Sequence, residues 1–157
     1  MSRPSKYFFI FIPLLLSALL FDMITTYNVL ISHPLWWESN QFIQLLIRYL
    51  GKESGLILFF LTVATIYIGV LLGLDSIKLY LSEGVFTGFV GGLHLLAGVF
   101  NLANFYYEWP YITYSNVHTL ELAYFLYWAI VLVSFQLMTL FPLVLFIELF
   151  WKKRKAA

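Results

Sequence analysis

The 157-residue sequence contains no cysteine, which excludes disulfides, iron–sulfur clusters, thiol catalysis and cysteine-ligated zinc. Charged residues make up only 11% of the chain, whereas a soluble domain carries about 25%. With nine glycines and five prolines, the composition is also unlike that of a disordered or collagen-like chain. The net charge of +1 provides no basic field, so we expect no nucleic acid partner.

What is abundant is apolar: 62% of the residues are hydrophobic and 20% are aromatic. A helix needs roughly 20 apolar residues to cross a hydrocarbon core about 30 Å thick. Four runs meet this requirement, at about 7–31, 54–74, 84–107 and 119–151. They predict an all-α, polytopic membrane four-helix bundle that forms a single transmembrane domain over residues 1–157. The fourth run is about 50 Å long as a helix, so we expect it to tilt, to begin outside the hydrocarbon or to bend at Pro142.

The basic residues predict the orientation. With four spans, both termini and the loop after the second span share one side of the membrane. That side carries seven of the nine basic residues, namely Arg3, Lys6, Lys78, Lys152, Lys153, Arg154 and Lys155. The positive-inside rule therefore predicts a multi-pass protein of the cell membrane with both termini in the cytoplasm.

A shorter segment at about 40–50 precedes the second span. Gln41, Gln44 and Arg48 recur there at helical spacing, and apolar residues fill the remaining positions. This pattern predicts a short amphipathic helix on the outer membrane surface.

An acidic residue interrupts the first span. Asp22 lies about 24 Å along the helix from Lys6, in the outer third of the membrane. A carboxylate at this depth is costly, so it should face the bundle interior and be paired or protonated. Thr25 and Thr26 follow at spacings of three and four and share its face. Asp22 is predicted either to bind a ligand or to fix the helix register through hydrogen bonds with Thr26 and a facing asparagine.

The third span carries a matching polar face. His94 and Asn101 lie on it at a spacing of seven, followed by Asn104 and Glu108. His94 and Asn101 bracket the expected depth of Asp22. They are interpreted either as site residues or as interhelical hydrogen-bonding groups.

Glycines lie on two faces of the same span. Gly91 and Gly98 share the polar face, where they would let a neighbouring backbone approach closely. Gly84, Gly88 and Gly92 form a second row that is also predicted to pack against a helix.

These residues predict a polar chamber that opens toward the outside and is closed by apolar packing on the cytoplasmic side. The loop after the first span and the start of the fourth span would add further polar groups. The candidate ligand-binding residues are Asp22, Thr25, Thr26, Glu38, Asn40, His94, Asn101 and Glu121. The acidic residues nearer the cytoplasm are interpreted as solvated helix ends; these are Asp75, Glu83 and Glu148.

No catalytic or cofactor motif is present, and cofactors and metals are left open. A three-histidine metal site would need His33, His94 and His118, but His94 lies too deep beside two loop residues. A mixed carboxylate–histidine site and a haem between two histidines are weaker alternatives.

Asp22, Thr25 and Thr26, followed by Glu38 and Asn40, resemble the signature of an uncharacterised, mainly archaeal family of small four-helix membrane proteins with a domain of unknown function. In that family an Asp-x-x-Thr-Thr sequence in the first helix precedes a Glu-x-Asn-Pro loop. The resemblance covers roughly residues 10–105 and departs at Gln41, where the family has proline. It implies a four-helix fold and a shared polar site, without a known activity.

A second similarity is to the emopamil-binding-protein (EXPERA) family of four-helix sterol isomerases and sterol-binding receptors. Asp22, Glu38, His94 and Glu121 correspond loosely to the acidic residues and histidine of that family.

Three functions fit these observations. The first is binding or transport of a cation, a proton or a small or lipid ligand in the outer chamber, with Asp22 as the charged group. The second is an accessory subunit of a larger membrane complex, with partner subunits or further copies of the chain against the polar faces. The third is a membrane-embedded enzyme that acts on a lipid by acid–base chemistry. In each case membrane lipids are expected partners.

Overall fold

The chain folds into long helices that lie along a common axis. The computed structural model describes residues 4–32, 40–107 and 117–156, within which the side chains of 103–107, 117–124, 126, 127 and 156 are left out. Every element in these ranges is an α-helix: α1 Lys6–Ser32, α2 Gln41–Leu50, α3 Lys52–Ser76, α4 Tyr80–Tyr107 and α5 Val117–Ala156. The predicted all-α four-helix bundle with one short additional helix is confirmed.

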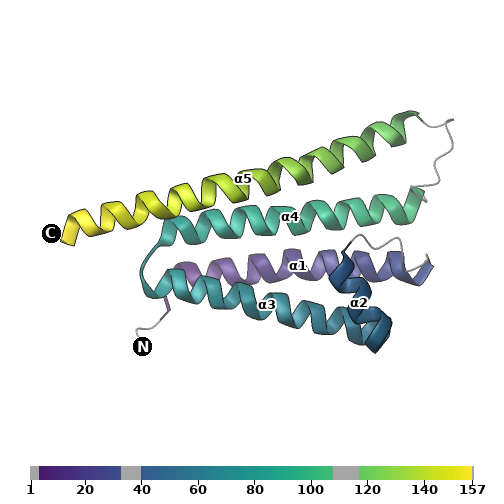
Figure 1. Cartoon of the computed structure of the whole chain (residues 1–157), viewed down its shortest axis with the longest axis horizontal. Coiled ribbons are helices and arrows are strands. Elements are labelled where there is room, and N and C mark those ends of the chain that lie inside the picture. Colours follow the sequence, from purple (N-terminus) through teal and green to yellow (C-terminus); the bar gives the residue numbers. More distant parts are fainter. Residues whose placement is uncertain (1–3, 33–39, 108–116, 157) are drawn as a thin grey trace.

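Figure 1 shows α1, α3, α4 and α5 side by side, with α2 lying across one end of α1 and α3. We call this the α2 end, and we call the opposite end, where α1 begins and α5 ends, the terminal end. Within the described ranges, four helical segments are long and apolar enough to cross a membrane: Lys6–Ser32, Lys52–Ser76, Tyr80–Leu102 and Trp128–Lys155. The chain is therefore a candidate multi-pass membrane protein.

The packing centres on α1 and α4, which share the most extensive helix contact. Two buried apolar clusters hold the bundle together. The terminal cluster consists of Phe8, Leu15, Leu71 and Val90. The α2-end cluster consists of Leu30, Ile43, Ile47 and Leu56. Along α1 the two clusters are separated by the stretch that contains Asp22.

Helix α5 lies along α4 on the outside of the bundle (Figure 1). It has 40 residues and continues through Pro142. None of the side chains from Trp128 to Lys155 is buried. Large apolar side chains such as Phe135 and Phe146 are exposed, as expected of a helix that faces lipid.

The two glycine-bearing faces of α4 differ in how closely a neighbouring helix approaches them. A Cβ atom at Gly98 would lie 2.5 Å from the Phe21 ring and 3.4 Å from the Cα of Asp22, so α1 and α4 approach closely here. At Gly88 and Gly92, by contrast, a Cβ would meet no atom within 4 Å. The prediction that the row of Gly84, Gly88 and Gly92 forms a packing face is therefore wrong at these two positions, because α1 packs against the face that carries Gly91 and Gly98.

Helix α2 is fixed at both ends. The Asn40 side chain accepts hydrogen bonds from the backbone N–H groups of Phe42 and Ile43, at 3.0 and 3.3 Å, and so caps the first turn. Gly51 ends the helix with a φ of 83°, a left-handed conformation that glycine adopts without a Cβ clash. Helix α3 begins at the next residue, so α2 folds back against it.

The docking of α2 depends on Gly55. A Cβ at this position would lie 2.8 Å from the backbone nitrogen of Ile47 and 2.9 Å from the carbonyl carbon of Leu46. We expect Gly55→Ala to displace α2 and to lower the free energy of unfolding by about 1–3 kcal/mol, the usual cost of overpacking. Thermal unfolding in detergent micelles measures this loss.

Gly69→Ala is the matched control, because a Cβ there meets no atom within 4 Å. If Gly55→Ala and Gly69→Ala unfold at the same temperature, the close contact between α2 and α3 is refuted.

Candidate functional site

The candidate site lies between the two apolar clusters and centres on Asp22 of α1. Its Oδ2 atom lies 2.7 Å from Nδ1 of His94 on α4. The two side chains are only 18% and 14% exposed, so most of their surface is shielded by neighbouring helices. A carboxylate and an imidazole at this distance form a strong, charge-assisted hydrogen bond.

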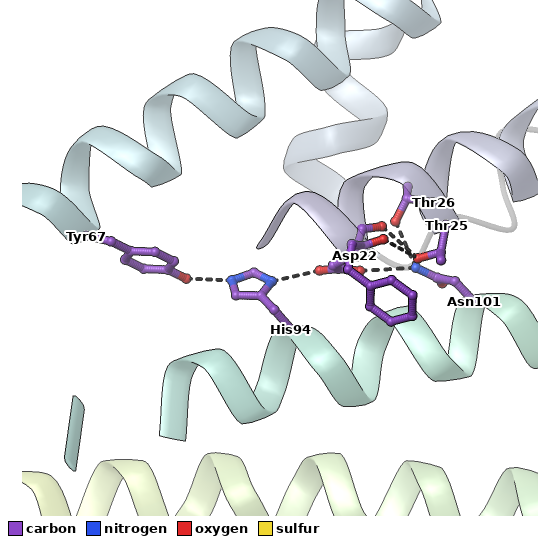
Figure 2. Close-up of polar contacts among 7 residues, drawn as sticks. Asp22, Thr25, Thr26, Tyr67, His94 and Asn101 are labelled. Carbon is purple, nitrogen blue, oxygen red and sulfur yellow. Dashed lines mark hydrogen bonds and ion pairs between the residues drawn. The ribbon is translucent and has the colours of Figure 1, made fainter. Parts of the chain in front are cut away.

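The other ring nitrogen of His94 contacts a third helix. Its Nε2 atom lies 2.9 Å from the hydroxyl oxygen of Tyr67 on α3. Figure 2 shows the resulting line of side chains from Tyr67 through His94 to Asp22. Both ring nitrogens of His94 are thus occupied, which fixes the orientation of the ring.

Asn101 completes the site from one side. Its amide nitrogen donates to Oδ1 of Asp22 at 3.2 Å and to the hydroxyl oxygen of Thr26 at 2.8 Å. Asn101 lies seven residues after His94, so both side chains leave the same face of α4 (Figure 2). Each oxygen of the Asp22 carboxylate therefore has a partner on α4. We call Asp22, Thr26, Tyr67, His94 and Asn101 the polar network.

A small cavity adjoins this network. It has a volume of about 20 Å³ and is lined by Leu19, Asp22, Met23, Thr26, Ile43, Leu56, Phe59 and Phe60. A cavity needs a volume of about 10–15 Å³ to hold a single water molecule. The cavity thus has room for one water molecule or one small ion beside the Asp22 carboxylate.

The network can hold one additional proton without losing any of its heavy-atom contacts. With neutral His94, Nδ1–H donates to Asp22 and Nε2 accepts from the Tyr67 hydroxyl. With protonated His94, Nε2–H donates to the Tyr67 oxygen instead, and the bond to Asp22 becomes an ion pair. The tyrosine hydroxyl can serve as donor or acceptor, so it is the group that permits this exchange.

The structure brings together four of the eight predicted site residues: Asp22, Thr26, His94 and Asn101. Thr25 is buried, but its hydroxyl donates to the backbone carbonyls of Phe21 and Asp22, at 3.1 and 2.9 Å. Asn40 lies at the start of α2, where its side chain caps the helix.

The other two predicted site residues are Glu38 and Glu121. Glu38 and the side chain of Glu121 lie outside the described residues. The same applies to Glu108 and to the side chains of Asn104 and His118.

Tyr67 is the member of the polar network that the sequence does not predict. It is one of 11 tyrosines in an aromatic-rich chain, and nothing in its local sequence distinguishes it from an interfacial or lipid-facing residue. Its role depends on the rotation of α3, which the apolar run from 54 to 74 does not determine.

Among the residues that the structure describes, no group of three or more histidine, aspartate or glutamate side chains is placed to hold a metal ion. Comparisons with models of protein families, with curated proteins and with solved structures give no match. The resemblances to the archaeal four-helix family and to the emopamil-binding-protein family therefore stay predictions.

The Asp22–His94 contact should be measurable as an energetic coupling. We expect a double-mutant cycle with Asp22→Asn and His94→Gln to give a coupling free energy of about 1–2 kcal/mol, in the upper range for polar pairs within membranes. Unfolding of the wild type, both single variants and the double variant provides the four free energies.

A second cycle that pairs Asp22→Asn with Thr139→Val is the control. Thr139 lies exposed on α5 and donates to the carbonyls of Phe135 and Gln136 on its own helix. A coupling near zero in both cycles contradicts a direct bond between Asp22 and His94.

Proposed function

We propose that this protein binds, and in the membrane exchanges or transports, a proton or a small hard cation at the Asp22 carboxylate. The observation that supports the proposal best is the position of Asp22. It lies inside a candidate membrane span, is largely shielded, and adjoins both an imidazole and a cavity of single-ion size. Ionisable groups at such positions are rare in membrane helices and mark ion or proton pathways.

The charge of the network supports a positively charged ligand. With neutral His94 and ionised Asp22, the network carries one net negative charge in a largely apolar region. Among the described residues no lysine or arginine lies within 4 Å of Asp22. A proton taken up by His94 converts this charge into an ion pair, and a small cation beside Asp22 would neutralise the same charge. The two ligands would therefore compete.

The donor atoms near the cavity suit a hard cation. Asp22 and Thr26 both line the cavity, and the carboxylate and hydroxyl oxygens of such residues bind Na⁺, Mg²⁺ or Ca²⁺. The surrounding side chains are apolar, so a cation would rely on these oxygens and on a water molecule.

The size of the cavity argues against a lipid or sterol at Asp22. A larger groove of about 260 Å³ lies nearer the α2 end and is lined by Met23, Tyr27, Glu53, Leu56 and Ile57. Neither Asp22 nor His94 lines this groove. A lipid seated there would not meet the acid–base pair, so the geometry favours ion binding over enzymatic action on a lipid.

The function is tested by titrating the purified chain in lipid nanodiscs with sodium chloride and measuring the heat of binding. We expect saturable binding at alkaline pH that weakens at mildly acidic pH, because protons compete for the same charge. Binding that does not change with pH would contradict this competition.

Asp22→Asn keeps the shape of the side chain and removes its charge, and it should abolish both sodium binding and its pH dependence. Glu53→Gln is the control, because it removes an exposed acidic residue on a different helix, α3. If Asp22→Asn binds sodium like the wild type, the proposed site is wrong. If the wild type binds neither Na⁺ nor, in parallel titrations, Mg²⁺ or Ca²⁺, only the proton remains as the ligand, and proton release on an alkaline pH jump must then be lost in Asp22→Asn.

A further inference from the structure

A second group of acidic side chains lies near the terminal end, and it is independent of the polar network. Asp75 is in the last turn of α3, Glu83 is in the first turn of α4, and Glu148 is near the end of α5. Their interpretation as solvated helix ends is wrong for two of them, since Glu83 is 0% and Asp75 only 8% exposed. Both α1 and α5 contact this region: the ring centroids of Tyr7 and Tyr80 lie 5.2 Å apart, and Glu148 of α5 bonds to the first turn of α4.

The Glu148 carboxylate has a structural role. Its Oε1 atom accepts the backbone N–H of Leu81 at 3.1 Å. Its Oε2 atom accepts the backbone N–H and the hydroxyl of Ser82, at 2.8 and 2.6 Å. Glu148 therefore caps the N-terminus of α4 from a different helix, and an anion is stabilised at that position.

Glu83 and Asp75 differ from Glu148, because they have carboxyl oxygen atoms that accept no hydrogen bond. Both carboxyl oxygens of Glu83 are buried and have no hydrogen-bond partner. Asp75 accepts the backbone N–H of Ser5 with Oδ2 at 3.0 Å, but its Oδ1 is buried and unpartnered. The hydroxyl oxygen of Thr87, one turn after Glu83 on α4, is also buried without a partner. Four buried oxygens thus lack a hydrogen-bond partner in one region.

The charged groups around Glu83 do not neutralise it. Its carboxyl group interacts electrostatically with Asp75 and Glu148, both of which are acidic. Of the basic residues at this end, Lys152 donates to the carbonyl of Ile77, Lys6 lies 5.2 Å from the ring centroid of Tyr7, and Lys78 in the turn between α3 and α4 is exposed. Among the described residues no lysine or arginine lies within 4 Å of any of the three carboxylates. An ionised Glu83 would therefore be a buried, unpaired anion beside two others, which is strongly unfavourable.

We propose that Glu83 and Asp75 together form a proton-binding site that exchanges its proton with the water at the terminal end of the bundle. The proton comes from that water and forms an O–H bond on Glu83, and its release returns it there. A protonated Glu83 supplies the donor that the region lacks, and the free Oδ1 of Asp75 is an available acceptor.

A metal ion fits these residues less well. Glu148 already uses both its oxygens on α4, which leaves two carboxylates, and no metal-binding group of three acidic or histidine residues is found in the described ranges. One proton also restores the charge balance without the several oxygen ligands that a hard cation requires.

The proton site is separated from the polar network. Glu83 and His94 lie on one face of α4, about 16 Å apart along the helix axis. Val90 lies between them along α4 and packs in the terminal cluster with Phe8, Leu15 and Leu71. Proton exchange at Glu83 therefore does not require the Asp22 site, and loss of one site should leave the other intact.

The proposal is tested by infrared difference spectroscopy of the full chain in lipid bilayers during a pH titration. We expect a protonated-carboxyl band that shifts in D₂O and disappears at alkaline pH. Glu83→Gln, which retains the shape of the side chain, should lack this band. Glu53→Gln should retain it, because Glu53 is exposed at the start of α3.

Asp75→Asn provides a second variant in case Glu83→Gln fails to fold. It removes the neighbouring negative charge, so the band should persist but disappear at a lower pH than in the wild type. The proposal is overturned if Glu83→Gln has the same carboxyl bands as the wild type, or if Asp75→Asn titrates like the wild type. It is also overturned if Glu83 gives carboxylate bands that shift on addition of Na⁺ or Mg²⁺, since the site would then bind a metal ion.

Discussion

The contact between Asp22 and His94 is the interaction on which the rest of the site depends. A carboxylate within a membrane span must be neutralised or satisfied by hydrogen bonds, and here the partners come from a neighbouring helix. This is possible because Gly98 brings the backbones of α1 and α4 close together at the same level. With a larger residue at that position, Phe21 and the Asp22 backbone would have to move away.

The position of the polar residues between two apolar clusters determines what they can do. The terminal cluster and the α2-end cluster shield the network from both sides, and only a small cavity is left beside Asp22. Within this shielded space His94 connects an acidic side chain to a phenol, so one proton can be added while the tyrosine hydroxyl reverses its role. The network is thus suited to a single positive charge rather than to a bulky organic ligand.

Much of this arrangement could be predicted from the sequence, because a bilayer imposes simple rules. The apolar runs gave the four long helices. Asp22, Thr26, His94 and Asn101 stood out because polar residues at helical spacing within an apolar run must face one another. Tyr67 did not stand out, because its contribution depends on how α3 is rotated against α4.

The errors have a similar physical origin. The place of Glu83 at a helix end predicts that it faces water, but the side chain is buried where α1 and α5 contact the first turn of α4. The sequence predicts that Gly88 and Gly92 pack against a neighbouring helix. Two faces of α4 carry glycines, however, and which of them packs depends on where α1 docks. Asn40 stays a predicted site residue, and in this structure its side chain caps α2. In each case the residue type predicts a polar group or a small side chain, but the atoms that contact it depend on how the helices dock or on local capping.

The central claim is that the Asp22–His94 pair carries an exchangeable positive charge. Its most direct test is ¹⁵N nuclear magnetic resonance of the His94 ring, with the chain in lipid bilayers and the pH varied. The account predicts that the wild-type ring exchanges between a neutral form with Nδ1–H and a doubly protonated form, and that Asp22→Asn changes the Nδ1 signal because the acceptor of its hydrogen bond is altered. A His94 ring that is the same at every pH, or whose Nδ1 signal is unchanged in Asp22→Asn, would contradict it.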